Sequence, residues 1–459
     1  MTTRALSAAL SLLLCGAAHA QQDAVAAFVG VSVIPMDTDR VLADQTVVIR
    51  GDRIMTIGRR ADVRVPEGAA EIDGRGKFLL PGLAEMHAHV PQPQQEQAIG
   101  AGYTERVLFL YVANGITTIR GMLGHPAHLE LRERIRRGEV IGPTLYTSGP
   151  SFNGNTAPNP ETAARMVREQ KAAGYDFLKI HPGLSRATFD ALARTADSMG
   201  IRFAGHVPAE VGLARALEAR YASIDHLDGY VDALAAGRTP TGTTAGFFGA
   251  NLVDAVDETR ITDLVRATRE AAVWNVPTQI LMTGFGGGDD PEAAGRRPEM
   301  RYMPPQVVAQ WVGSKRNFQS QPDYSAEQLQ RFITLRGRII KALHEAGAGL
   351  ALGSDAPQVM NVPGFSALAE LEALVAAGLT PYQALEIGTR NVAAYFGTLD
   401  RTGTVAEGKV ADLVLLNANP LGDIGSVRNR AGVMLRGRWL PAAEIDRRLD
   451  EIAAAYATN

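Results

Sequence analysis

Short apolar runs alternate with stretches of helical periodicity from about residue 81 to residue 397. This alternation predicts an α/β fold, and a count of about eight runs predicts a (β/α)8 barrel of the TIM type over residues 81–397. The runs are LLPGLAEMHAHV, GITTIR, PTLYTSGP, DFLKIHP, RFAGHVP, ASIDHLDG, VPTQIL and AGLALGSDAP.

Both flanks of this region carry strand patterns instead. Residues 21–80 contain Val- and Ile-rich runs punctuated by Gly-Asp and Asp-Gly pairs, and similar runs return within residues 398–459. We therefore expect residues 21–80 and 398–459 to pair into one small β-sandwich, with the barrel inserted between them.

Residues 1–20 have the layout of a cleaved signal peptide. Arg4 precedes an apolar run, and Ala18-His19-Ala20 is a small-x-small cleavage site. The sequence therefore predicts an exported protein, periplasmic or secreted. The single cysteine, Cys15, lies in this segment, so the mature chain is expected to have neither a disulfide nor a thiol nucleophile.

The amino-acid composition limits the kinds of binding partner that we expect. The 46 Lys and Arg residues and the 49 Asp and Glu residues give a formal net charge of −3, which offers no electrostatic case for nucleic acid or an anionic membrane. After the signal peptide no apolar stretch reaches the roughly 18 residues of a transmembrane helix. We expect a small-molecule or short-peptide substrate, and apolar faces on the barrel helices would allow a homo-oligomer.

Polar side chains end several of the apolar runs. His87 and His89 are two residues apart on one strand, so they share a face and converge as metal ligands must. Lys179 lies inside an apolar strand, where an unpaired ammonium is costly. Barrel active sites lie at the carboxyl ends of the strands. The residues expected there are His87, His89, Lys179, His206, His226 and Asp355.

This order of residues resembles the amidohydrolase superfamily, in its binuclear-metal branch with a carboxylated lysine. The segments PGLAEMHAHV, KIHPGLS, AGHVP, IDHL, LGSDAP and GTVAEGKVADLVLL are similar to imidazolonepropionase-like and Xaa-Pro dipeptidase-like members. The resemblance implies two divalent metal ions, with Zn²⁺ expected. It assigns His87, His89 and Asp355 to one metal and His206 and His226 to the other, with Lys179 carboxylated by CO2 as the bridge.

The resemblance also implies a reaction. We expect a hydrolase of carbon–nitrogen bonds other than peptide bonds, or a metallo-dipeptidase, that cleaves small peptides or N-acyl amino acids by metal-activated hydroxide. Asp355 would accept the proton of the metal-activated water and pass it to the leaving amine. Three alternatives stay open: a mononuclear deaminase, in which Glu210 would act after His206; a cyclic-amide or lactone hydrolase; and a non-catalytic solute-binding protein.

Three further residues are weaker candidates. Tyr230, four residues after His226, resembles a tyrosine that polarises or holds the substrate in related peptidases, so we place it among both the catalytic and the substrate-binding residues. Arg301 and Tyr302 could hold a substrate carboxylate. They lie in one of two segments that interrupt the barrel rhythm and are candidate substrate loops, residues 231–260 and 283–325.

Three positions call for comment. Glu85 stands where related sequences commonly have Asp, and Gly121 stands where related dipeptidases often have Asp after an Arg. His181 lies two residues after Lys179, where it could share a face with the lysine, although a place in the loop before Pro182 is the simpler expectation.

Overall fold

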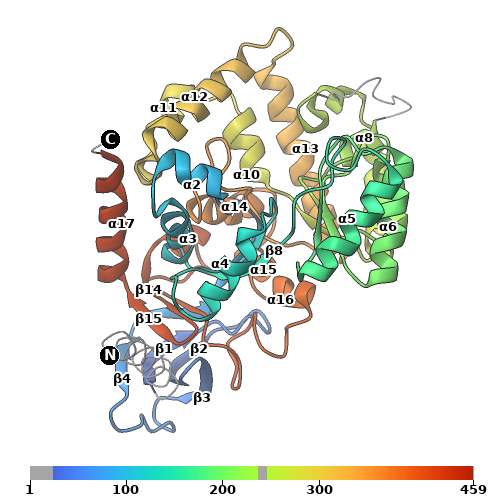
Figure 1. The fold of residues 1–459 in the computed structure, drawn as a ribbon. Helices are drawn as coiled ribbons and strands as arrows, with labels where there is room; N and C mark the ends of the chain where they lie inside the picture. The colour runs from blue at the N-terminus through green and yellow to red at the C-terminus, as the bar shows by residue number, and fades with distance from the viewer. Residues whose placement is uncertain (1–23, 236–245, 458–459) are drawn as a thin grey trace, which may run out of the picture.

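The computed structural model describes residues 24–235 and 246–457. The predicted signal peptide, residues 1–20 with Cys15, lies outside the described residues. The fold is α/β, as predicted: a body of helices and parallel strands adjoins a predominantly antiparallel sheet at one end of the molecule (Figure 1). No helix among the described residues has both the length and the apolar character needed to cross a membrane.

The sheet at that end is built from both ends of the chain. Its eight strands follow the order β15-β14-β13-β5-β1-β2-β3, with β4 paired to β1. Strand β13 joins the two halves by pairing antiparallel with β5, so that Leu413 lies opposite Pro81. The pairing of the two flanks is thus confirmed, but as one eight-stranded sheet, so the predicted β-sandwich is seen only in part. The strands are β1 (Val25–Val33), β2 (Leu42–Arg50), β3 (Arg53–Arg59), β4 (Ala70–Asp73), β5 (Phe78–Pro81), β13 (Leu413–Leu416), β14 (Arg430–Leu435) and β15 (Arg438–Pro441).

The middle of the chain forms two parallel sheets. One has the order β6-β7-β8 and the other β12-β11-β10-β9. Consecutive strands pair as neighbours, which is the pattern expected when each strand is followed by a helix that returns the chain. The strands are β6 (Leu83–Ala88), β7 (Ile116–Gly121), β8 (Thr144–Thr147), β9 (Leu178–Ile180), β10 (Phe203–Gly205), β11 (Ser223–Asp225) and β12 (Trp274–Val276).

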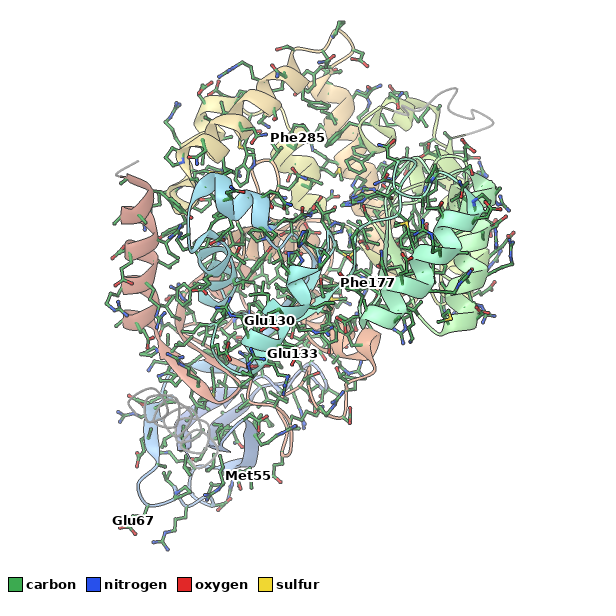
Figure 2. The ribbon with its side chains drawn as sticks, in the orientation of Figure 1. Met55, Glu67, Glu130, Glu133, Phe177 and Phe285 are labelled. Carbon is green, nitrogen blue, oxygen red and sulfur yellow. The ribbon has the colours of Figure 1, made fainter. Side chains whose placement is uncertain are left out.

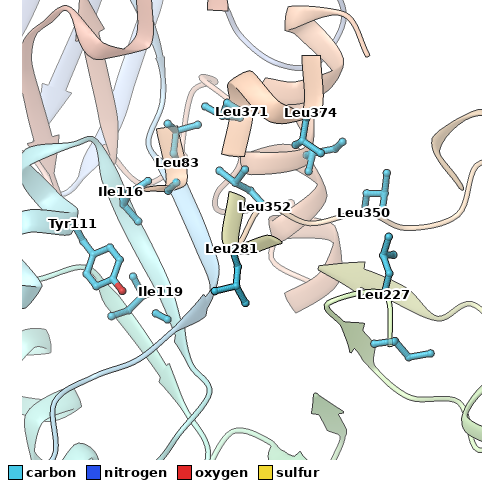
Figure 3. Packing of buried hydrophobic residues seen from close by; sticks show 14 of the residues in the cluster. Leu83, Tyr111, Ile116, Ile119, Leu227, Leu281, Leu350, Leu352, Leu371 and Leu374 are labelled. Carbon is cyan, nitrogen blue, oxygen red and sulfur yellow. The ribbon is translucent and has the colours of Figure 1, made fainter. Parts of the chain in front are cut away.

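Isolated parallel bridges continue these sheets. Ser148 pairs with Phe177, between the end of β8 and the start of β9. The segment 350–356 runs between β12 and β6, where Leu350 pairs with Asn275 and Ala356 pairs with Ala88. Apolar side chains from this segment and its neighbours pack together, among them Leu83, Ile116, Leu352 and Leu371 (Figure 3).

Helices follow the parallel strands, and their ends carry clear local signals. Asn159 accepts a hydrogen bond from the Thr162 amide at the start of α5, and Gly174 ends that helix in the left-handed conformation. The α-helices within residues 24–235 are α2 (Pro93–Ile99), α3 (Tyr103–Ala113), α4 (Ala127–Arg136), α5 (Pro160–Ala173), α6 (Arg186–Met199), α7 (Gly212–Glu218) and α8 (Tyr230–Leu234). The later ones are α9 (Ile261–Glu270), α10 (Gln279–Leu281), α11 (Pro291–Gly295), α12 (Pro305–Gln319), α13 (Ala326–Glu345), α14 (Phe365–Ala376), α15 (Pro381–Gly388), α16 (Arg390–Phe396) and α17 (Ala442–Ala457).

The two segments predicted as candidate loops are largely helical where they are described. Residues 283–325 hold α11 and α12, which lie at the end of the molecule opposite the terminal sheet (Figure 1). Residues 231–260 hold most of α8 and the irregular helix η1, and residues 236–245 fall outside the description. The short helices of other types are η1 (Phe247–Ala255), η2 (Glu258–Arg260), η3 (Met282–Gly286), η4 (Pro298–Tyr302) and η5 (Ile424–Arg428).

Candidate metal centre and active site

Six predicted residues lie at the carboxyl ends of the central strands. His87 is in β6 and Lys179 in β9, whereas His89, His206 and His226 follow the ends of β6, β10 and β11. The sixth, Asp355, belongs to the segment 350–356, which is paired to β6 and β12. Because parallel strands end at one edge, six residues far apart in the sequence face the same region.

The distances show that they converge. His87 Nε2 lies 3.5 Å from Lys179 Nζ and 3.5 Å from Asp355 Oδ1. His89 Nε2 lies 2.5 Å from the same Asp355 oxygen. The ring of His226 lies between two others, with centroids 4.5 Å from His87 and 4.6 Å from His206. The structure therefore brings all six residues into one cluster.

Part of this cluster has the spacing of a metal site. One ligand atom each from His87, His226 and Asp355 lies within 4.8 Å of the others, and all three side chains are buried. Burial places the pKa of His87 and of His226 well below the ordinary histidine value, which keeps both rings neutral with a free lone pair. His226 Nε2 is buried with no hydrogen-bond partner. Imidazole nitrogens and a carboxylate oxygen are donors that suit Zn²⁺, so these residues fit a metal ion.

The far nitrogen of three imidazoles faces an outer partner. His87 Nδ1 lies 2.9 Å from Asp225 Oδ2, and His206 Nδ1 donates to Asp228 Oδ2 at 2.8 Å. His226 Nδ1 is hydrogen-bonded to Thr278 Oγ1 at 2.8 Å. Such partners orient a ring and leave Nε2 for the metal. These outer partners were not predicted from the sequence, although Asp225 and Asp228 flank His226 in the segment IDHLD.

Asp225 is in turn held by a buried arginine. Arg120 NH2 donates to both carboxylate oxygens of Asp225, at 3.1 and 3.2 Å, and both side chains are fully buried. Its remaining donors reach Met86 O, Ser223 Oγ and Tyr395 Oη. All the guanidinium nitrogens are thus hydrogen-bonded, which compensates for burying the charge. Arg120 fixes the carboxylate that faces His87.

Glu85 connects two segments of the site through hydrogen bonds. Its carboxylate accepts hydrogen bonds from the amides of His87 and Ser354 and from the Ser354 hydroxyl, at 3.0, 2.7 and 2.5 Å. It therefore links β6 to the segment that carries Asp355. Burial raises the pKa of this carboxyl to about 8. Gly353 leaves room for the link, because a Cβ there would lie 3.2 Å from Glu85 Oε1 and 3.0 Å from the His87 amide.

Lys179 is fully buried and makes no ion pair with a carboxylate among the residues that are described. Burial lowers its pKa to about 8. Its side chain occupies space that a glycine provides: a Cβ on Gly205, where φ is +125°, would lie 2.9 Å from Lys179 Cδ and 3.1 Å from Nζ. The residue before His206 is therefore glycine for a steric reason.

His181 also belongs to this surrounding. Its ring stacks on that of His206, with centroids 5.2 Å apart and an interplanar angle of 27°. Burial lowers the pKa of His181 to about 2. His181 directly follows the last residue of β9, so the expected place in the loop before Pro182 is confirmed, and from that loop the ring stacks on a candidate ligand. By contrast Glu210, which a deaminase would use, is exposed to solvent.

The three weaker candidates are not brought to the cluster. Tyr230 is fully buried and its hydroxyl is hydrogen-bonded to Thr268 in α9, so its place does not support a contact with substrate. Tyr302 is buried and stacks on Phe365, and Arg301 donates to the Tyr302 hydroxyl. Arg301 lines a different cavity, beside α17, because η4 packs against that helix. The structure thus does not support the substrate-binding role of Arg301 and Tyr302.

Comparison with known proteins agrees with this arrangement. The model of the amidohydrolase family matches residues 78–440. An imidazolonepropionase of Cupriavidus taiwanensis is 27% identical over 269 residues, which cover 46% of this chain and 63% of that protein. The match thus spans less than two thirds of the length of this relative.

Two solved structures are similar in fold. The bottromycin amidohydrolase superposes with a TM-score of 0.72 at 24% identity, covering 96% of this chain and 93% of its own. A Xaa-Pro dipeptidase with methionine bound in its active site has a TM-score of 0.66 at 20% identity, covering 91% and 100%. Since the family model spans most of the described chain and contains the whole cluster, this protein belongs to the amidohydrolase family.

Proposed function

We propose that this chain is an exported, metal-dependent amidohydrolase that cleaves amide bonds of small peptides or N-acyl amino acids. The observation that carries the proposal is the convergence of His87, His89, Lys179, His206, His226 and Asp355 at one edge of the parallel strands. We further infer that the two parallel sheets and the segment 350–356 are arcs of one closed (β/α)8 barrel, because the isolated bridges continue each sheet into the next.

Two divalent ions, Zn²⁺ by the chemistry of the donors, would be held by His87, His89 and Asp355 and by His206 and His226. When bound, such ions polarise the scissile carbonyl and lower the pKa of water. Lys179 would bridge them as a carbamate, formed when its neutral amine adds to CO2 and releases a proton. The lowered pKa of Lys179 supports this step because it increases the fraction of neutral amine near pH 7.5.

The residues of this chain divide the remaining work. Asp355 accepts the proton from the attacking water at its carboxylate and passes it to the leaving amine. His89, whose Nε2 lies 2.5 Å from Asp355 Oδ1, holds that carboxylate in place. Glu85 keeps the segment of Asp355 against β6 through Ser354.

The test combines metal analysis with a substrate screen. Protein loaded with Zn²⁺ and bicarbonate is expected to bind about two ions per chain and to hydrolyse members of a dipeptide and N-acyl amino-acid panel. Asp355→Asn is the control and should reduce kcat by at least about a hundredfold, because proton transfer contributes about that much or more. Binding of fewer than about one ion per chain, or a panel with no turnover, would contradict the proposal.

Replacing Lys179 distinguishes the proposed binuclear hydrolase from a mononuclear deaminase. Lys179→Ala should lose metal and activity together if the lysine bridges two ions, whereas a mononuclear deaminase would keep both.

Export is tested by sequencing the N-terminus of the protein recovered from the producing cells. A mature chain that begins after Ala20 is expected, and one that retains Met1 would refute cleavage.

A further inference from the structure

A cavity of about 840 Å³ adjoins the candidate metal centre. Its lining includes the candidate ligand His206 and the outer partner Asp228, so the cavity borders the cluster at His206. The rest of its inner wall is mainly apolar and includes Val207, Pro208, Leu213, Phe247 and Phe248. An apolar cavity that opens onto a polar reaction centre is the usual form of a substrate pocket.

Phe248 is the aromatic side chain of this wall that contacts the ligands. Its ring centroid lies 5.3 Å from that of His226 and 6.5 Å from that of His206, nearly parallel to the latter at 19°. The backbone of Phe248 is in the left-handed region, with φ 51° and ψ 32°. A bulky residue adopts this conformation rarely and at a cost, and such residues cluster at functional sites.

Further aromatic rings support the wall from behind. Phe247 packs against Phe285 at 5.4 Å and against Phe318 at 4.9 Å between centroids. Phe285 lies at one end of the molecule, and the terminal sheet with Met55 lies at the opposite end (Figure 2). The segment of Phe285 is fixed by the fully buried Lys315, whose Nζ donates to the carbonyls of Gly284, Phe285 and Gly287.

Most of the charged groups that line the cavity have a partner or are exposed to solvent. Arg186 and Arg215 both pair with Asp190, and Asp228 is engaged by His206. Arg260 is exposed to solvent. Glu218 lies 3.5 Å from Arg215, and burial raises the pKa of Asp232. Around Phe248 the cavity is therefore lined mainly by apolar side chains.

We propose that this cavity binds a neutral aromatic or bulky apolar substituent next to the scissile amide, and that Phe248 is the residue that selects it. This inference rests on the proposed function. A ring placed between Phe248 and the apolar wall leaves water while the amide carbonyl stays beside the metal-ligating imidazoles. Substrates that carry a charge or only a methyl group at this place lose that burial.

The experiment compares matched substrates on either side of the amide. N-benzoylglycine is compared with N-acetylglycine, and N-acetylphenylalanine with N-acetylglycine, on the metal-loaded full chain. In at least one pair we expect kcat/KM to favour the aromatic substrate by about tenfold to a hundredfold. Phe248→Ala should reduce that ratio to near one, and Phe248→Leu should keep part of it. No aromatic preference in either pair, or a ratio unchanged in Phe248→Ala, would overturn the proposal.

Phe318→Leu is the matched control. Phe318 packs behind Phe247 and does not belong to the lining of the cavity, so the ratio should stay near that of the wild type. An equal loss in Phe318→Leu would mean that loosening of the aromatic cluster, and not contact with Phe248, sets the preference, which would refute the assignment.

A binding measurement separates this proposal from the proposed function. If no amide is hydrolysed, the proposed function fails, but the cavity can still be probed with benzamide by saturation-transfer NMR. Benzamide should bind the wild type and bind Phe248→Ala about tenfold more weakly. Absence of binding to the wild type, or equal binding to both proteins, would overturn the cavity assignment independently of turnover.

Discussion

His87 shows how contacts outside a metal centre decide what a single side chain can do. Its Nδ1 faces the carboxylate of Asp225, which is itself clamped by Arg120, so Nε2 is directed at Asp355 and Lys179. The ring is thus fixed in orientation before any ion arrives, and a ligand that needs no rearrangement binds a metal more tightly.

Asp225→Asn tests this arrangement. The amide keeps the shape of the side chain but removes the charge that faces His87 and Arg120, so we expect the affinity for Zn²⁺ to fall by about tenfold to a hundredfold. Competition with a chromophoric chelator measures it. Asp254→Asn, which changes an exposed carboxylate paired with Arg331, is the matched control and should leave the affinity unchanged. Equal affinity in Asp225→Asn and the wild type would disprove the role of the clamp.

Glu370 gives a prediction about pH. Its buried carboxylate accepts hydrogen bonds from the amides of Gln279 and Ile280, at 2.8 and 2.6 Å, and burial raises its pKa to about 7. A carboxyl whose pKa is raised on folding contributes stability that is present below about pH 4.5 and is lost as the pH rises through about 7.

Glu370→Gln should therefore flatten the dependence of the free energy of unfolding on pH between about 4.5 and 7. The expected change in slope is about one proton, or about 1.4 kcal/mol per pH unit. Urea unfolding of metal-free protein at several pH values measures it, so that loss of metal does not contribute. An unchanged slope would show that Glu370 titrates normally in the folded chain.

At the scale of the element, strand β10 ends in a glycine that makes room for the centre. A methyl group on Gly205 would meet Ile180 O at 2.5 Å and Lys179 Cδ at 2.9 Å, and φ is +125°. Gly205→Ala should lower the free energy of unfolding by about 2 kcal/mol or more and reduce metal content, because strain and overpacking both act there.

The comparison for that change is Gly200→Ala, at the end of α6. Gly200 also has a positive φ, of +60°, but nothing lies within 4 Å of its added Cβ. It should cost about 1 kcal/mol and leave metal content intact. Calorimetric unfolding and metal analysis distinguish the two variants; equal metal content in both would refute the steric argument for Gly205.

Element-scale signals also explain what the sequence could predict. The strand ends that carry His87, His206 and His226 were predictable because an apolar run followed by a polar ligand is a local pattern. The helices α11 and α12 were missed, although Asp290 and Pro291 form a good helix start, because Gly- and Arg-rich neighbours hide the periodicity. Tyr230 was misplaced because the direction of a helical side chain depends on packing against α9, which no local pattern encodes.

At the scale of the whole molecule, the terminal sheet depends on residues from both ends. Strand β5 pairs with β1 on one side and with β13 on the other, so neither end completes the sheet alone. This long-range pairing was predictable only as a shared strand character of the two flanks, whereas the register requires the folded chain.

Hydrogen exchange tests this dependence. The backbone amides of Phe78–Pro81 and Leu413–Leu416 that pair with each other should exchange at similar rates, and the two strands should lose protection together as denaturant is raised. Strand β3, at the edge of the sheet, should exchange earlier. Separate loss of protection in β5 and β13 would show that the two flanks open as independent units.

The contact between His89 and Asp355 joins positions 266 residues apart. A growing polypeptide therefore cannot complete the cluster of candidate ligands before residue 355 has been synthesised. A bound metal ion would link the first and last parts of the parallel framework and so stabilise the completed fold. Chelation should accordingly loosen both extremes of the framework together.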